Sequence, residues 1–408
     1  MRVLMLSHLY PRPHHPDLAV FIRRQVAELT RLGVSVRVVS PVPWAPPLLV
    51  RTSRLRRVLA QSQASPQAWE IDGIRVDAPR YWKLPGRFDL GTHGPLYDRS
   101  VRRPVRRIFH DEGFDLIHAQ MLVPDGFAAA RLGRELGVPS VATERGYLPS
   151  QANGRWWDRR AVRFAIENVD QTVFVARALA ELAGHVGEPR REPRVVHTGI
   201  DAERFQPRDR RGARLELGLD PEQPIVLLVG GNVVKKGLLV LLDALPRLLT
   251  RHPRLALVVI GEGGVAPQIA ARIRAARLGA HVRLLGRRPH DELPRWYAAA
   301  DVVTLPSFRE GLPNSLVEAA ACARPIVATA ILGIPEVVLD GQTGYLVPPG
   351  DPARLAEALD SVLCEPERSR EMGRLGRAHV VARFSWRRHA EEMLDVYRSV
   401  RARPRLGA

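Results

Sequence analysis

Two glutamates, Glu310 and Glu318, are separated by seven residues and follow a short apolar run, Val302–Leu305. Such a run is typical of a buried parallel strand, so we expect it to carry Glu310 to the carboxyl end of a sheet, where open α/β folds bind their ligands. Carboxylates at that edge can accept hydrogen bonds from two sets of sugar hydroxyls, one on either side of a phosphate group. The pair therefore indicates a binding site for a ligand that carries both.

The residues between the two glutamates predict a helix that begins at the ligand. A glycine and a proline keep a helix from starting at Glu310, so we expect it to begin near Asn314 or Ser315. Its free N–H groups and the positive end of its dipole suit a diphosphate. One alternative stays open, because Ser315-x-x-Glu318 is also the pattern of a capping box, in which Glu318 only closes the helix N-terminus.

A pair of lysines precedes another expected helix. Lys235 and Lys236 stand between the apolar run Ile225–Val229 and the helical pattern Gly237–Leu249. A cation at a helix N-terminus is unfavourable unless an anion binds there. Lys236 therefore indicates a bound phosphate, and a cation at this place stabilises a phosphate that departs in the transition state. A surface lysine that merely opens the helix is the alternative.

The elements that must position these residues form two series of alternating strands and helices. In the first half the expected strands are Val3–Leu6, Val34–Val39, Leu116–Ala119, Ser140–Thr143, Thr172–Val175 and Arg194–His197. In the second half they are Ile225–Val229, Leu255–Ile260, Val282–Leu284, Val302–Leu305, Ile326–Ala328 and Gly344–Leu346. Alternation at this rhythm implies parallel sheets with helices on both faces. We therefore predict an α/β chain of two Rossmann-like domains that face each other across a cleft.

The expected domain boundaries follow from where the alternation stops. Residues 207–220 are charged and lack a strand pattern, so we expect them to link a first domain at residues 1–206 to a second at residues 221–385. The last segment, residues 386–408, opens with a helical pattern that we expect to cross back to the first domain. A chain of 408 residues is long enough for two domains with separate cores.

The formal net charge of +18 is unevenly distributed, and two arginine-rich stretches, Arg51–Arg57 and Arg99–Arg107, lie in the first half. Such clusters attract phosphates, either on an anionic membrane surface or on nucleic acid. A solvated surface in an arginine-rich chain is the alternative. No nucleic-acid recognition motif accompanies the clusters, so we expect no nucleic-acid partner.

The composition also bears on the compartment. The two cysteines, Cys322 and Cys364, cannot form a disulfide framework and lack the spacing of metal ligands. No apolar run approaches the ~20 residues that span a bilayer, and Met1–Leu6 runs directly into a strand pattern, so we expect no signal peptide. We expect a cytoplasmic protein, and the basic first half adds the hypothesis of a peripheral position at the inner face of the cell membrane.

Taken together, these motifs resemble those of the retaining glycosyltransferases of family four, which have the two-domain GT-B fold. The resemblance covers nearly the whole chain. Besides Glu310-x7-Glu318, the matching segments are Tyr10–Pro13, Phe21–Val26, His197–Phe205, Gly261–Gly263, Ala300–Asp301, Pro335–Glu336 and Asp340–Gly344. Chains that open in this way resemble the polysaccharide-assembly enzymes of the family, such as the teichuronic acid and exopolysaccharide types.

The resemblance implies a role for each matched residue. Glu310 and Lys236 are the expected catalytic residues: Glu310 faces the donor sugar, and Lys236 neutralises the diphosphate. Glu318 is expected to bind the ribose hydroxyls. The other expected donor contacts are Gly311, Leu312, Pro313, Asn314, Gly231, Lys235 and Glu262. The expected acceptor-side residues are Arg145, Gly146, His8 and Tyr10.

The chain departs from the family pattern at three positions of the expected site. Gly231 stands where the family commonly has an arginine, so the donor phosphates rest on Lys236, with or without its neighbour. Arg145 stands where the family has a histidine, and an arginine cannot act as a base but can bind an acceptor phosphate or the donor diphosphate. Ala19 replaces a glycine of the opening loop.

The expected function is the transfer of a sugar, with retention, from a UDP- or GDP-sugar to a glycan or lipid-linked acceptor in cell-surface polysaccharide synthesis. No Asp-x-Asp motif is present, so we expect no essential metal, and no cofactor besides the co-substrate. A nucleotide-sugar epimerase on the same fold and a non-catalytic scaffold that binds nucleotide-sugars stay open. A Rossmann dehydrogenase and a P-loop NTPase are disfavoured, because the glycine fingerprint and the Gly-Lys-Ser/Thr ending are absent.

Overall fold

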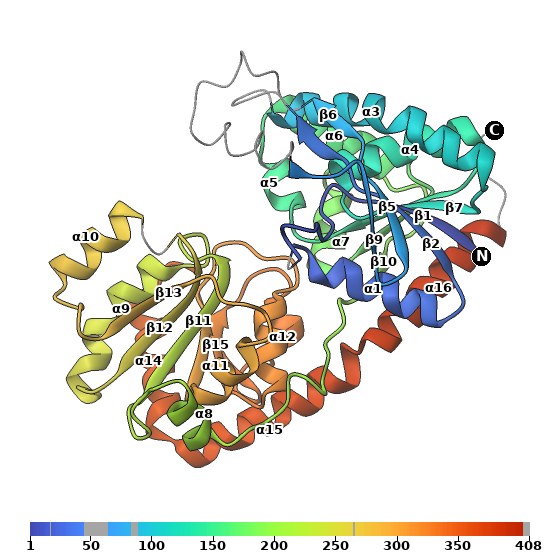
Figure 1. Ribbon diagram of the computed structural model, residues 1–408. Coiled ribbons are helices and arrows are strands. Elements are labelled where there is room, and N and C mark those ends of the chain that lie inside the picture. The colour runs from blue at the N-terminus through green and yellow to red at the C-terminus, as the bar shows by residue number, and fades with distance from the viewer. Residues whose placement is uncertain (17, 45–63, 83–88, 264–265, 403–408) are drawn as a thin grey trace. The chain divides into compact units, whose positions relative to one another are not determined.

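The computed structural model describes residues 1–16, 18–44, 64–82, 89–263 and 266–402. They form two compact units, one made of Met1–Gly199 and Trp386–Ala408 and the other of Ile200–Ser385 (Figure 1). Each unit contains a sheet of mainly parallel strands with helices on both faces, which confirms the predicted α/β class. The arginine-rich stretch Arg51–Arg57 lies outside the described residues.

The first unit is built on an eight-stranded sheet in the order β10-β9-β8-β7-β1-β2-β5-β4. Its strands are β1 (Arg2–Leu6), β2 (Ser35–Val39), β4 (Ala68–Ile71), β5 (Ile74–Asp77), β7 (Leu116–Ala119), β8 (Ser140–Glu144), β9 (Gln171–Phe174) and β10 (Arg194–Val195). The pairing of β4 with β5 is antiparallel, which corrects the expectation of a purely parallel sheet. The two strands join at Asp72 and Gly73, which both have positive φ, as a tight type I′ hairpin requires.

The helices of the first unit cover both faces of this sheet. Helices α1 (Val20–Arg31) and α16 (Trp386–Ala402) lie on one face, and α3 (Asp89–Asp111), α4 (Phe127–Leu136) and α6 (Trp156–Asn168) lie on the other (Figure 1). The remaining elements are β3 (Val42–Trp44), β6 (Arg80–Trp82), the π-helical turn Leu122–Gly126, α5 (Leu148–Ala152) and α7 (Arg177–Gly184). Met393 and Tyr397 of α16 share a buried core with Ile22 and Val26 of α1, so the end of the chain packs with its beginning.

The second unit is built on a six-stranded sheet in the order β13-β12-β11-β14-β15-β16. Its strands are all parallel: β11 (Ile225–Asn232), β12 (Ala256–Glu262), β13 (Val282–Gly286), β14 (Val302–Leu305), β15 (Ile326–Thr329) and β16 (Gly344–Val347). Its helices are α8 (Arg210–Glu216), α9 (Leu238–Arg251), α10 (Pro267–Ala275), α11 (Leu293–Ala299), α12 (Asn314–Ala321), α13 (Ile334–Val337), α14 (Pro352–Cys364) and α15 (Pro366–Arg383). Because β11 and β14 are central neighbours, the segments that follow them meet at one edge of the sheet.

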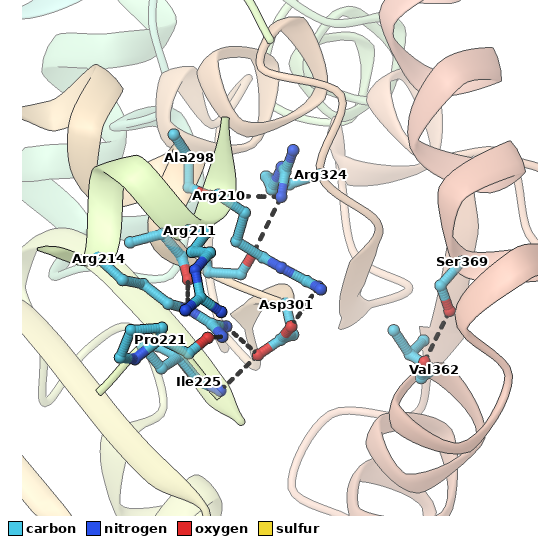
Figure 2. A network of polar contacts seen from close by, with 12 residues as sticks. Arg210, Arg211, Arg214, Pro221, Ile225, Ala298, Asp301, Arg324, Val362 and Ser369 are labelled. Carbon is cyan, nitrogen blue, oxygen red and sulfur yellow. Dashed lines mark hydrogen bonds and ion pairs between the residues drawn. The ribbon is translucent and has the colours of Figure 1, made fainter. Parts of the chain in front are cut away.

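Residues 207–220, which we expected to form a linker, contain helix α8 and belong to the second unit. The buried guanidinium of Arg214 donates a hydrogen bond of 2.6 Å to Asp301, which also accepts one from the amide that opens β11 (Figure 2). Arg210 forms an ion pair with the other carboxylate oxygen of Asp301. The charges that suggested a linker therefore fix α8 to the sheet.

The stretch Arg99–Arg107 lies on α3 and is partly neutralised. Arg102 and Arg106 form ion pairs with Glu135 of α4. The other arginines follow a four-residue spacing along the exposed side of the helix: Arg99, Arg103 and Arg107. None of the helices in the described part of the chain is both long enough and apolar enough to cross a membrane.

Candidate active site

The two residues expected to be catalytic meet in the second unit. The ammonium of Lys236, after β11, donates to both carboxylate oxygens of Glu310, after β14, at 2.6 and 2.7 Å. The hydroxyl of Ser307 donates a further hydrogen bond of 2.6 Å to Glu310. Glu310 is only 5% exposed, and a buried carboxylate is stable only when a cation and hydrogen bonds compensate it. Since an ammonium has three N–H donors, Lys236 keeps one for a further acceptor.

Glycines let the backbone segments converge around this pair. A Cβ on Gly237, whose φ is +83°, would lie 1.9 Å from the carbonyl oxygen of Pro306, and one on Gly261 would lie 1.7 Å from that of Gly230. Both positions therefore require glycine. Gly231 differs, because no atom of the described residues beyond its chain neighbours lies within 4 Å of a Cβ built there. Crowding does not explain why the family's arginine is missing at Gly231.

Glu318 is held by two side chains that the sequence did not indicate. One carboxylate oxygen lies 2.8 Å from His290 Nε2, and the other accepts a hydrogen bond of 2.9 Å from the hydroxyl of Tyr297. Helix α12 begins at Asn314, as expected, and no side chain of the described residues caps its first turn. The capping-box alternative for Glu318 is therefore wrong, and the carboxylate is bound by α11 and the loop before it.

Phe205 packs behind both partners of Glu318. Its ring centroid lies 5.3 Å from that of His290 and 6.0 Å from that of Tyr297, and Phe205 itself is only 1% exposed. Arg204 adds an ion pair with Asp291, next to His290. The segment His197–Phe205, matched only as a family motif, thus supports the carboxylate at Glu318.

The other expected donor contacts lie around the start of α12 and the ends of β11 and β12. Gly311, Leu312 and Pro313 are buried, whereas Lys235 and Glu262 are exposed. The carboxylate of Glu262 lies 3.8 Å from the guanidinium of Arg287. These residues therefore lie at the same edge of the sheet as Glu310 and Glu318. Between the two glutamates, the segment offers backbone groups rather than side chains to a ligand.

Arg145, after β8 in the first unit, is compensated differently. Its guanidinium donates hydrogen bonds of 2.6 Å to the side-chain oxygens of Gln25 and Gln120 and lies 5.0 Å from the ring centroid of Phe21. No carboxylate of the described residues forms an ion pair with it. Desolvation lowers the pKa of Arg145 only to about 10, so it stays charged at neutral pH.

Two buried histidines beside Arg145 add no charge at neutral pH. Desolvation, helped by the charge of Arg145, lowers the pKa of His389 to about 3 and holds that of His118 well below its usual value. His389 Nδ1 donates to the carbonyl oxygen of His197, and His118 contacts the hydroxyls of Tyr397 and Thr143, each at 2.7 Å. These two histidines therefore add no positive charge to that of Arg145.

The other acceptor-side candidates divide into two groups. Gly146 donates its amide to the buried carboxylate of Glu144, and His8 contacts the buried carboxylate of Asp125 at 3.0 Å. Both therefore have positions fixed by an acidic side chain. Tyr10, by contrast, is 1% exposed and packs within the hydrophobic core, so its expected acceptor contact stays a prediction.

Two family models match the chain. The model described as Glycosyltransferase Family 4 matches residues 18–204, and the one described as Glycosyl transferases group 1 matches residues 209–379. The D-inositol 3-phosphate glycosyltransferase of Segniliparus rotundus is 39% identical over 404 residues, which cover 93% of this chain and 84% of the relative. The chain belongs to glycosyltransferase family 4. The enzyme of the same name from Nocardia farcinica is 36% identical to this chain, which covers 83% of that enzyme's length.

Solved structures share the fold of this family 4 glycosyltransferase. The sucrose-phosphate synthase of Thermosynechococcus elongatus superimposes with a TM-score of 0.80 at 23% identity, covering 98% of this chain and 99% of that one. HepE of Anabaena, solved with UDP and glucose, gives a TM-score of 0.74 at 20% identity, over 98% and 100% of the two chains. The predicted family and GT-B fold are confirmed, and the chain is an enzyme that transfers a sugar from a nucleotide-sugar.

One group of metal-ligating side chains occurs in the described part of this glycosyltransferase. His252, after α9, lies 2.9 Å from Asp360 on α14, and Cys364 lies one turn further along α14. Cys364 was not expected near such ligands, because they come together only through the packing of the two helices. Arg251 already forms an ion pair with Asp360, so a cationic side chain competes with any metal there.

Proposed function

We propose that this family 4 glycosyltransferase transfers a sugar from a UDP-sugar, with retention at the anomeric carbon, to a hydroxyl group of a phosphorylated acceptor. The contact of Lys236 with Glu310 at the ends of two central strands is the observation that carries this proposal. The HepE structures with UDP and with UDP-glucose favour a uridine donor. The relatives named for D-inositol 3-phosphate favour an acceptor that carries phosphate.

The two glutamates divide the donor between them in this proposal. Glu318 binds the ribose, because each of its oxygens already accepts one hydrogen bond and retains a lone pair for a ribose hydroxyl. Glu310, fixed by Lys236 and Ser307, faces the donor sugar. The backbone at Gly311 and Leu312 contacts the sugar or the phosphates.

The leaving diphosphate is stabilised by fixed positive groups. Lys236 offers its remaining N–H, and the uncapped first turn of α12 offers amides and the positive end of its dipole. Donors aimed at charge that develops in the transition state lower the barrier most. In the retaining reaction, the leaving phosphate takes the acceptor's proton on the same face, so the proposal needs neither a protein base nor a metal ion.

Arg145 is the proposed acceptor contact in the first unit. Its charge is held by neutral amide oxygens rather than by a carboxylate, so a phosphate remains a favourable partner for it. A lipid-linked acceptor in cell-surface polysaccharide synthesis, at the inner membrane face, also presents phosphate and is the second candidate. The net positive charge of the chain, +18, favours it.

The test is a Glu310→Gln variant, assayed for transfer and for hydrolysis with UDP- and GDP-sugars. Acceptors are inositol 3-phosphate, inositol and a lipid-linked glycan. Removing the charge is expected to lower turnover by about 100-fold or more, the usual loss for a transition-state contact. Glu357→Gln, which changes an exposed carboxylate on α14, is the matched control. Unchanged turnover in Glu310→Gln, with folding intact, would sink the assignment.

A further inference from the structure

A groove of about 710 Å³ lies on the first unit between α6 and α7, apart from the residues used above. Helix α6 has the sequence WWDRRAVRFAIEN, so aromatic and basic side chains are concentrated in its first turns. Its arginines line the groove together with half-buried apolar residues from both helices and the segment after α7: Phe164, Leu182 and Val186. The groove therefore combines an apolar floor with a cationic wall.

Most of the positive charge on this wall is not compensated. Arg159 and Arg160 are exposed, and neither forms a hydrogen bond or an ion pair with another described residue. Arg163 forms an ion pair of 2.7 Å with Glu167, the only acidic residue in the described lining. On α3, by comparison, Glu135 neutralises Arg102 and Arg106, and Arg99, Arg103 and Arg107 stay exposed. An anion would restore the balance at α6.

One tryptophan, Trp156, lines the same groove, and a second follows it in the sequence. Trp156 is 67% exposed, and its ring meets that of Trp157 edge to face at 5.5 Å. The guanidinium of Arg155 lies 5.0 Å from the ring centroid of Trp157. Tryptophan rings favour the boundary between lipid headgroups and acyl chains, and neighbouring arginines bind headgroup phosphates.

We propose that this surface, formed by Trp156, Arg159, Arg160 and the groove beside them, binds the headgroup layer of an anionic membrane. Headgroup phosphates contact the two unpaired arginines, and Trp156 enters the interface next to them. The apolar floor favours lipid over nucleic acid, because a nucleic-acid track requires a continuous row of phosphate contacts and base-stacking aromatics. The inference does not depend on which acceptor the enzyme uses.

The experiment measures co-sedimentation of the full chain with vesicles of phosphatidylglycerol and phosphatidylcholine, and with vesicles of phosphatidylcholine alone. The double variant Arg159→Glu/Arg160→Glu is expected to lose binding to the anionic vesicles by about tenfold or more, because each basic residue near such a surface contributes about a factor of five. Trp156→Ala is expected to reduce binding to a smaller extent. The unfolding temperature of the double variant should match that of the unaltered chain, since the side chains of Arg159 and Arg160 form no hydrogen bond or ion pair with another described residue.

The matched control is Arg103→Glu/Arg107→Glu on α3, which reverses the same number of exposed arginines in the same unit, again without an ion pair to a described residue. Retained binding in this control, with loss in the α6 variant, supports the proposal. An equal loss in both would show general charge attraction and overturn it. Equal binding of the unaltered chain to both vesicle types would also overturn it, as would binding of inorganic phosphate or an oligonucleotide at this surface without binding to vesicles.

Discussion

The two units of the enzyme compensate their buried charges in opposite ways. In the second unit, Glu310 is matched by Lys236, and Glu318 is bonded to His290 and Tyr297. In the described part of the first unit, the guanidinium of Arg145 donates its hydrogen bonds to amide and hydroxyl oxygens and lies over the ring of Phe21. One site is built from carboxylates with hydrogen-bonding partners, and the other is built around a cation that forms no ion pair with a carboxylate of the described residues.

This difference has a chemical consequence for substrate binding. A donor-side carboxylate that already has a cation can still bind hydroxyl groups, since these need only lone pairs. A cation held by neutral oxygens retains its net charge and favours an anion more strongly than a hydroxyl group. The comparison therefore predicts that selectivity for a phosphorylated acceptor resides in the first unit.

The largest effect is expected from removing the unmatched charge, in the variant Arg145→Gln. The preference for inositol 3-phosphate over inositol, expressed as a ratio of kcat/KM values, should fall by about 10- to 100-fold, because a hydrogen bond to a charged group contributes about 1.5–3 kcal/mol. Arg145→Lys, which keeps the charge but loses the planar fork, should retain part of the ratio. If both acceptors lose activity to the same extent, Arg145 supports the fold instead of reading the phosphate.

An intermediate effect is expected from the buried His389 in a stability titration. Because its pKa in the folded chain is about 3 instead of 6.5, the unfolded chain takes up a proton below pH 6.5 that the folded chain does not. Stability should therefore fall with decreasing pH across this window, by about 1.4 kcal/mol per pH unit from this group. His389→Asn keeps a donor for the carbonyl of His197 but cannot titrate.

Urea unfolding of His389→Asn at several pH values checks this sign. Its stability should depend less on pH between pH 6.5 and 4 than that of the unaltered chain, and the two curves should run parallel above pH 7.5. Parallel curves throughout the acid range would mean that His389 is already protonated in the fold. The region around Arg145 would then carry a second positive charge.

The elements that deliver the donor residues were predictable from sequence for a physical reason. Strands β7 and β14 are buried along their whole length, so each appears as a short run with three apolar residues in four, and the predicted bounds Leu116–Ala119 and Val302–Leu305 are those observed. Strand β4 is half-exposed at a sheet edge and gives no such run. Helix α8 was missed because its stabilising contact, Arg214 with Asp301, joins residues far apart in the chain.

The same limit applies to the site. Family motifs indicated Glu310, Glu318 and Lys236 individually. Lys236 and Glu310 are 74 residues apart in the sequence, and their contact forms only in the folded sheet. His290 and Tyr297 belong to no motif that the sequence presents, and only packing against Phe205 brings them to Glu318. Sequence patterns alone therefore could not predict which side chains contact each other at the sheet edge.

The smallest effect is expected from adding a cation to the unit that already has its charges matched. Gly231→Arg introduces the residue that the family commonly has, at an exposed position with open space around the Cβ. The variant should fold with an unchanged unfolding temperature and bind a UDP-sugar several-fold more tightly in calorimetry, since one further exposed cation near a diphosphate contributes about 1 kcal/mol or less. Gly237→Ala is the contrasting variant, because its Cβ would collide with the carbonyl of Pro306 and move the start of α9. Tighter binding of the UDP-sugar by Gly231→Arg would place its diphosphate beside Lys236. Unchanged binding would mean that the phosphates lie closer to α12 and that another residue takes the role of the missing arginine.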